Sequence, residues 1–134
     1  MEYLSKSEDE TFKIATDFAN SLEDAHQGKA KMIGLYGELG AGKTTLMKGF
    51  AKYFGINKTI QSPTFVIEKI YELQIQTSNF KHLIHIDAYR IEKSEELVNL
   101  GWNKITTDPK NLICVEWPER IADKIGRASC RERV

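Results

Sequence analysis

The chain has 134 residues with 19 basic and 19 acidic side chains, so its formal net charge is +0 and no overall field draws it toward nucleic acid. Hydrophobic residues make up 41% and charged residues 28%, a balance typical of a folded domain and not of a disordered chain. No apolar run is long enough to span a membrane and no secretory signal opens the chain, so we expect one cytoplasmic domain without membrane attachment.

The first predicted element is a helix that begins after Ser7. Ser7 and Glu10 have the S-x-x-E spacing of a capping box, and apolar residues recur at helical spacing from Phe12 to Leu22. We expect the helix to end near Gly28. Its first turn has two interpretations, simple capping or a position over the base of a bound nucleotide. Residue chemistry favours capping, because every helix needs a cap.

A phosphate-binding motif lies between a predicted strand at 31–36 and a predicted helix at 45–54. The stretch Gly37-Glu38-Leu39-Gly40-Ala41-Gly42-Lys43-Thr44 reads G-x-x-x-x-G-K-[ST]. Its glycines let backbone N–H groups close around a phosphate without a Cβ in the way, and amides at the start of the next helix favour an anion. Because strand, loop and helix occur in the required order, the motif predicts a nucleoside triphosphate site and not an ordinary glycine-rich turn.

The motif also assigns roles to its residues. Lys43 is expected to reach the β and γ phosphates, and the Thr44 hydroxyl is expected to bind Mg²⁺. The residues expected to surround the phosphates are Leu39, Gly40, Ala41, Gly42, Lys43, Thr44 and Thr45.

A β-hairpin is predicted next. Pro63 disfavours helical geometry for the residue before it, so the chain bends here into extended structure. Apolar, β-branched and aromatic residues at 65–73 and 81–86 predict two strands, and 76–79 reads as the turn between them. Thr64 at the bend has two interpretations that its chemistry leaves open. It either senses the γ-phosphate from a mobile loop or satisfies a turn.

Short helices and one buried strand follow the hairpin. A helix is predicted from Ser94 to a stop at Gly101. The apolar run at 112–115 predicts a buried strand. Pro118 is well placed to begin a last helix at 119–124.

Two carboxylates are candidates for the acidic partner that a phosphate loop needs for Mg²⁺. Asp87 and Glu116 each follow an apolar run, at strand ends where α/β folds present ligand-binding groups. Glu116 has the cleaner context, because four apolar residues precede it. The alternative is a pair of surface carboxylates. With a phosphate loop in the same domain, we expect at least one to contact the metal directly or through water.

Three weaker signals do not predict function. His82 and His85 are three residues apart on a predicted strand, so they point to opposite faces and cannot share a metal. The run at 103–106 resembles a guanine-reading N-K-x-D motif but has threonine where aspartate is required, so GTP specificity is unsupported. Trp117 next to Glu116 is interpreted as packing, with shielding of a metal site as the alternative.

The motifs together resemble one protein family. They are Gly37 to Thr45, Ser62-Pro63-Thr64-Phe65, His85-Ile86-Asp87-Ala88-Tyr89-Arg90, Glu95-Glu96-Leu97 with Leu100-Gly101, and Val115-Glu116-Trp117-Pro118. In this order they resemble the TsaE (YjeE) family of small bacterial ATPases over roughly residues 5–124, far more specifically than the phosphate loop alone does. The resemblance agrees with an α/β fold, a P-loop NTPase-like three-layer sandwich whose mixed, mostly parallel sheet includes an antiparallel hairpin.

The resemblance implies a function and its cofactors. Proteins of this family use ATP and Mg²⁺ and are needed for threonylcarbamoyladenosine synthesis at position 37 of tRNAs that read codons starting with adenine. They do not make the modification themselves. They bind a TsaD–TsaB heterodimer, and their ATP hydrolysis supports its repeated turnover. We therefore expect weak intrinsic hydrolysis that the partner complex completes.

Site roles follow from the resemblance by position. Lys43 contacts phosphates, while Thr44 and Glu116 hold Mg²⁺. Asp87 lies close to the γ-phosphate and is important for hydrolysis. Thr64 belongs to a switch-like loop.

The first helix of the family borders the adenine. Glu8 and Thr11 are the corresponding positions here, which strengthens the functional interpretation of the first helical turn. Residue chemistry alone does not identify which nucleotide base the chain binds.

The resemblance stops before the last residues of the chain. Family members continue past the Glu-Trp-Pro segment with further strands, whereas residues 125–134 are basic, have no strand or helix period and do not resemble the family. We expect a single P-loop ATPase domain at 1–124, a non-family tail of artefactual origin at 125–134, and missing C-terminal strands.

Two other functions compete with the ATPase subunit. A small-molecule kinase would need an arginine-rich lid, yet Arg90 is the only arginine between the phosphate loop and Glu116. A nucleotide-dependent interaction switch without useful turnover differs only in its kinetics, which the sequence does not separate. Direct tRNA binding is not expected, because the net charge is zero and no RNA-binding module is recognisable.

Overall fold

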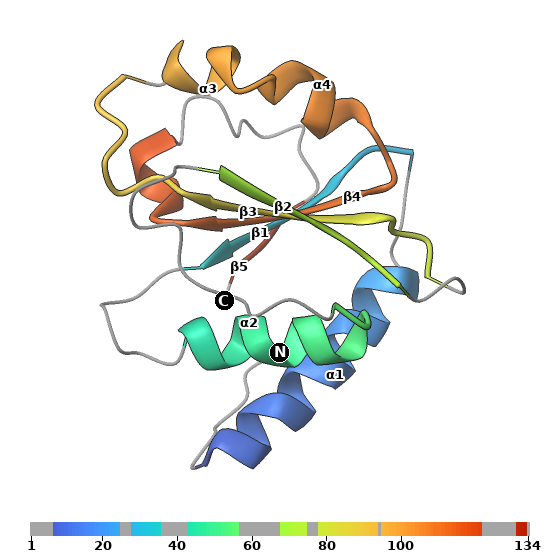
Figure 1. Ribbon diagram of the computed structural model, residues 1–134. Coiled ribbons are helices and arrows are strands. Elements are labelled where there is room, and N and C mark those ends of the chain that lie inside the picture. Colours follow the sequence, from blue (N-terminus) through green and yellow to red (C-terminus); the bar gives the residue numbers. More distant parts are fainter. Residues whose placement is uncertain are drawn as a thin grey trace.

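The computed structural model describes residues 7–24, 28–35, 43–56, 68–74, 78–93, 95–121 and 131–133 (Figure 1). In chain order, their helices and strands are α1 (Glu8–Asp24), β1 (Lys31–Leu35), α2 (Lys43–Tyr53), β2 (Glu68–Glu72), β3 (His82–Asp87), α3 (Glu95–Asn99), α4 (Trp102–Thr107), β4 (Asn111–Glu116), the 3₁₀ helix η1 (Pro118–Ile121) and β5 (Arg131–Arg133). Within these residues, every helix is too short or too polar to cross a bilayer.

The strands pair into a five-stranded sheet in the order β2-β3-β4-β1-β5. Strands β3, β4, β1 and β5 run parallel, and β2 pairs with β3 antiparallel. The predicted mostly parallel sheet with an antiparallel hairpin is therefore confirmed. Parallel pairing brings the carboxyl ends of β3, β4 and β1 to one edge, which is where α/β proteins bind ligands.

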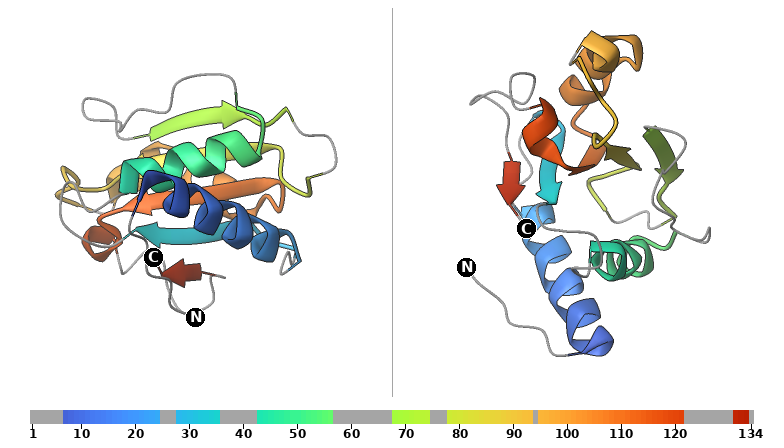
Figure 2. Two further views of the ribbon diagram at one scale, coloured as in Figure 1. Left: turned by 90° about the horizontal axis from the view of Figure 1, so that it is seen from below. Right: turned by 90° about the vertical axis from the view of Figure 1, so that its left-hand side faces the viewer.

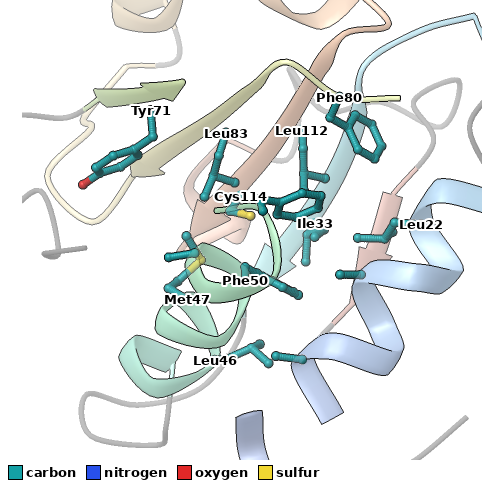
Figure 3. Packing of buried hydrophobic residues seen from close by; sticks show 14 of the residues in the cluster. Leu22, Ile33, Leu46, Met47, Phe50, Tyr71, Phe80, Leu83, Leu112 and Cys114 are labelled. Carbon is teal, nitrogen blue, oxygen red and sulfur yellow. The ribbon is translucent and has the colours of Figure 1, made fainter. Parts of the chain in front are cut away.

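Helices α1 and α2 cover one face of the sheet, and their apolar stripes meet alternate strand residues (Figure 3). Phe50 and Met47 of α2 and Leu22 of α1 are almost fully buried there, against Ile33 and Leu83 of the sheet. Full burial of such a side chain stabilises the fold by roughly 1.5–3 kcal/mol before entropy is counted. The helical spacing read from the sequence therefore corresponds to the real contact face.

The shorter helices cover the opposite face, which gives three layers (Figures 1 and 2). Leu97 of α3, Trp102 of α4 and Ile121 of η1 are buried with the sheet residues whose side chains alternate to this side. Those sheet residues are Met32, Ile84, Ile86, Ile113 and Val115. Because both faces are covered, the central strands are apolar on both sides.

Helices α1 and α2 pack against each other and cross obliquely, and both begin toward the same side of the molecule (Figures 1 and 2). A Cβ built on Gly49 of α2 would lie 2.5 Å from the Ala15 Cβ and 3.3 Å from the ring of Phe12, both on α1. Further along both helices, the Tyr53 hydroxyl donates a hydrogen bond of 2.8 Å to Oδ1 of Asn20. The first turns of α1 and α2 therefore lie toward the same end of the helical layer.

Helix boundaries agree with several sequence signals. The Glu10 N–H donates to Oγ of Ser7 at 3.1 Å, which confirms Ser7 as the cap of α1. Gly101 has a φ of 80° and separates α3 from α4, so the predicted stop is correct. Helix α4 itself was not predicted, because its Trp-Asn-Lys-Ile-Thr-Thr sequence is too short to show a helical period.

The end of the chain differs from expectation in two places. Pro118 begins a helix as predicted, but the described part of it is 3₁₀ and ends at Ile121, while 122–124 lie outside the described residues. The sequence pattern predicts no strand in 125–134, yet Arg131–Arg133 form β5. This strand depends on the edge of β1, with which it pairs in parallel, and its own three charged residues carry no strand signal. The domain boundary at residue 124 stays a prediction.

The contact at Gly49 yields a stability prediction. Gly49→Ala is expected to lower the free energy of unfolding by on the order of 1–2 kcal/mol, measured by urea denaturation. Alanine gains about 1 kcal/mol of helix propensity over glycine, but its Cβ would push α1 away from α2.

The matched control is Lys48→Ala, at the neighbouring exposed position of the same helix. This variant is expected to unfold within about 0.5 kcal/mol of the parent chain. A Gly49→Ala chain as stable as the parent would contradict the close helix contact.

Candidate functional site

The candidate site lies where β3, β4 and β1 end. Asp87 and Glu116 are the last residues of β3 and β4 and stand directly opposite each other in the parallel register. Leu35, the last residue of β1, stands opposite Glu116 on the other side. The phosphate-binding motif continues from Leu35 and leads to α2, which begins at Lys43. The sheet thus places Glu116 on the strand next to β1, from which the motif leaves, and Asp87 one strand further away at the same edge.

The described residues include only part of the predicted site. Lys43 and Thr44 form the first turn of α2, which confirms that the motif leads into a helix, but their side chains lie outside the described part, as does the side chain of Glu8. Thr45 is half-buried in the same turn. The remaining predicted positions lie outside the described residues and are Leu39, Gly40, Ala41, Gly42 and Thr64. Their roles stay predictions.

Asp87 is half-buried and held by local hydrogen bonds. Its Oδ1 accepts a hydrogen bond of 3.0 Å from the Tyr89 N–H, a turn that fixes the carboxylate just past the strand end. The next residue, Ala88, donates its N–H to the Glu116 carbonyl at 3.0 Å. The backbone after β3 is therefore tied to the end of β4, so the two carboxylate residues are positioned together.

Glu116 is buried, with only 7% of the residue exposed. Its Oε2 lies 3.0 Å from Nε2 of His85, which is 2% exposed. A buried carboxylate is costly unless a polar or charged group compensates it, and the imidazole supplies one such partner here. Glu116 is thus a built-in acidic group at the site and not a solvated surface residue.

The sequence interpretation missed His85. It tested this histidine only against His82, as a shared metal ligand, and the described residues contain no cluster of three or more metal-ligating side chains. The relevant signal is strand alternation. In the register of β3 and β4, His85 pairs with Cys114, two residues before Glu116, so His85 and Glu116 share one face of the sheet. This relation requires the strand order, which one sequence does not provide.

Aromatic side chains lie next to the carboxylates. The Tyr89 and Trp117 rings are 5.1 Å apart, and the Arg120 guanidinium lies 5.5 Å from the centre of the Tyr89 ring. Trp117 also packs against the core on the α4 side, which confirms its interpretation as a packing residue. Its φ is 57°, a left-handed conformation that is costly for a bulky residue, and strained residues of this kind are enriched at active sites.

The chemistry of the two carboxylates fits Mg²⁺. This ion prefers oxygen ligands and is usually held by one or two carboxylates together with substrate phosphates, not by a cage of protein groups. Asp87 and Glu116 at adjacent strand ends match that number and type of ligand. A metal that prefers sulfur or nitrogen ligands would need donors other than these two carboxylates.

Thr11 lies in the first turn of α1. Its hydroxyl donates to the Ser7 carbonyl at 3.1 Å, and its N–H donates to the same oxygen. This contact supports the capping interpretation of the turn. The expectation that Glu8 and Thr11 border an adenine stays a prediction, although α1 and α2 begin toward the same side of the helical layer (Figure 2).

Comparisons with known proteins agree on one family. The family model described as "Threonylcarbamoyl adenosine biosynthesis protein TsaE" matches residues 5–133. A protein of Rickettsia conorii named tRNA threonylcarbamoyladenosine biosynthesis protein TsaE is 40% identical over 116 residues, which cover 86% of this chain and 59% of that protein. The protein of the same name from Aquifex aeolicus is 35% identical over 121 residues, which cover 89% of this chain and 77% of that protein.

A solved structure has the same fold. The crystal structure of YdiB from Bacillus subtilis matches with a TM-score of 0.63 and 27% identity, over 96% of this chain and 72% of that one. The chain thus spans between 59% and 77% of the two named relatives and 72% of the solved chain.

The buried face also predicts how Cys114 reacts. Burial, and then the charge of Glu116, raise the pKa of the Cys114 thiol far above its ordinary value. Because the thiolate is the nucleophile, native Cys114 is expected to resist a thiol reagent such as DTNB at pH 8 and to react fully in denaturant. The measurement uses a Cys130→Ser chain, so that only Cys114 contributes. Equal labelling rates in the native and unfolded chains would contradict the buried placement.

Proposed function

This chain belongs to the TsaE family of threonylcarbamoyl adenosine biosynthesis proteins, and we propose that it is an ATP-binding and ATP-hydrolysing subunit of that pathway. The family acts in the threonylcarbamoyladenosine modification of tRNA. The observation that carries the proposal is that the phosphate-loop motif connects β1 to α2 in the chain, while Glu116 and Asp87 end the next two strands at the carboxyl edge of the same sheet. Because the chain spans only part of its relatives, the activity of the whole protein is part of the proposal.

The proposed division of labour follows the chemistry of each group. Lys43 neutralises the β and γ phosphates, and Thr44 and Glu116 hold Mg²⁺. When bound, Mg²⁺ supplies positive charge that offsets the negative charge of the triphosphate. Asp87 acts at the γ-phosphate in hydrolysis, since it is anchored through Oδ1 at the carboxyl end of β3.

The remaining contacts surround the nucleotide. Backbone amides of Leu39 to Thr45 wrap the phosphates, and Thr64 responds to the γ-phosphate from a switch-like loop. Glu8 and Thr11 border the adenine. The direction of α1 relative to α2 supports this last assignment, because it brings both first turns toward one end.

The proposed partner is a TsaD–TsaB heterodimer, whose repeated turnover ATP hydrolysis would support. We propose weak hydrolysis by the isolated chain, because the residue chemistry identifies no catalytic base or arginine finger. Direct contact with tRNA is not part of the proposal, since the formal net charge is zero. The cytoplasm is the proposed location, because tRNA is modified there.

Asp87→Asn is expected to lower ATP turnover by about 100-fold or more while ATP affinity changes only a few-fold. Asparagine keeps an oxygen that accepts the Tyr89 N–H, so the turn survives and only the charge is lost. Steady-state phosphate release and binding of a fluorescent ATP analogue measure the two effects. Lys43→Ala in the same assays is expected to weaken binding itself.

Asp108→Asn is the matched control. Asp108 Oδ1 accepts an equivalent hydrogen bond of 2.9 Å from the Lys110 N–H, but it precedes β4 and so lies at the opposite end of the sheet. Turnover in this variant is expected to equal that of the parent. A parallel loss in Asp87→Asn and Asp108→Asn would show that the effect comes from the turn and not from the site.

Partner dependence is the second prediction for this function. Addition of the TsaD–TsaB heterodimer is expected to raise ATP turnover by the chain at least about tenfold, since the partner would complete a weak site. The assay compares phosphate release with the chain alone, the partner alone and both together. Equal rates with and without the partner would refute the partner-dependent mechanism, and no turnover in any mixture would favour an interaction switch.

A further inference from the structure

His85 and Glu116 are in direct contact, and none of the roles proposed above involves this contact. The Nε2 and Oε2 atoms are 3.0 Å apart, and both residues lie on the face of the sheet that α2 covers. His85 is 2% exposed, so water does not compete for its ring. The contact joins a central strand to the last residue of its neighbour.

The contact identifies the ring nitrogen that donates to Glu116. The Nδ1 atom of His85 is buried and has no hydrogen-bond partner among the described residues. A carboxylate can only accept, so Nε2 carries the hydrogen and donates it to Oε2 of Glu116.

The backbone restricts where this ring can go. His85 pairs with Lys69 of β2 on one side and with Cys114 of β4 on the other, so its Cα is held by two strands. Cys114 is fully buried on the same face. The imidazole is therefore a fixed donor, and a fixed donor limits the rotamers of the carboxylate that it binds.

We propose that His85 is a positioning residue that holds the Glu116 carboxylate in the orientation needed for Mg²⁺ of the bound nucleotide. This inference rests on the proposed function, in which Glu116 is a metal ligand. Carboxylates that bind metals are generally oriented by a further hydrogen bond, and loss of that bond typically weakens metal affinity or activity 10–100-fold. His85 acts through Glu116 and does not touch the nucleotide.

The competing explanation is that the pair only satisfies two buried polar groups. The two explanations differ in what depends on the metal. A purely structural pair would affect the stability of the fold and would change ATP binding equally with and without Mg²⁺. A positioning residue changes the gain in ATP affinity that Mg²⁺ produces.

The test measures binding of a fluorescent ATP analogue to the full chain, in EDTA and over a Mg²⁺ titration, together with thermal melting. His85→Leu is expected to raise the Mg²⁺ concentration at half-effect by about 10–100-fold, with affinity in EDTA within about twofold of the parent. His85→Gln keeps an N–H near the position of Nε2 and is expected to recover most of the loss. His82→Gln, on the same strand but half-buried, is the matched control and is expected to behave like the parent.

A second measurement needs no nucleotide. A ¹⁵N–¹H spectrum of the imidazole rings is expected to show a hydrogen on Nε2 of His85, and a ring with its hydrogen on Nδ1 alone would overturn the proposal because Nε2 could not then donate to Glu116. An unchanged Mg²⁺ response in a folded His85→Leu chain, or equal weakening with and without Mg²⁺, would also overturn it. If the parent chain bound no ATP under any condition, the proposed function would fail and this inference with it.

Discussion

The candidate site depends on one constraint, the parallel pairing of β4 with β3 on one side and with β1 on the other. This register puts Asp87, Glu116 and Leu35 in one row across the sheet, each at the carboxyl end of its strand. Strand side chains alternate between faces, so a slip of one residue would turn Glu116 toward α4 and away from α2. Burial of the apolar residues that precede each carboxylate therefore fixes the strand register, and the register aligns these three strand ends.

On the sheet face that α1 and α2 cover, the side chains change from apolar to acidic along β3 and β4. Successive pairs across β3 and β4 are Leu83 with Leu112, His85 with Cys114, and Asp87 with Glu116. The first pair belongs to the apolar core, the middle pair is buried but polarisable, and the last pair carries charge. Polarity therefore increases stepwise toward the carboxyl ends of these strands. The buried Glu116 carboxylate contacts a hydrogen-bond donor and not hydrocarbon alone. This gradient connects the packing of the sheet to the chemistry at its edge.

Much of this arrangement could be predicted from local patterns in the sequence. The period of α2, the cap at Ser7, the hairpin and the strand before Glu116 were readable because each depends on neighbours in sequence. Helix α4 and strand β5 were not, since α4 is shorter than two helical turns and β5 takes its structure from the edge of β1. The contact of His85 with Glu116 was hidden for a related reason. It joins residues 31 positions apart, through a strand order that only the folded sheet defines.

The packing of α1 and α2 has an electrostatic consequence. Each helix carries a macrodipole equivalent to roughly half a positive charge at its first turn. The close contact at Gly49 and the buried phenylalanines hold the two helices so that both begin toward one side of the layer. In α1, Asp9 and Glu10 offset the positive end, whereas the first turn of α2 has no acidic residue. The uncompensated positive end is therefore that of α2, so the helical layer favours an anion where the helix after the phosphate-binding motif begins.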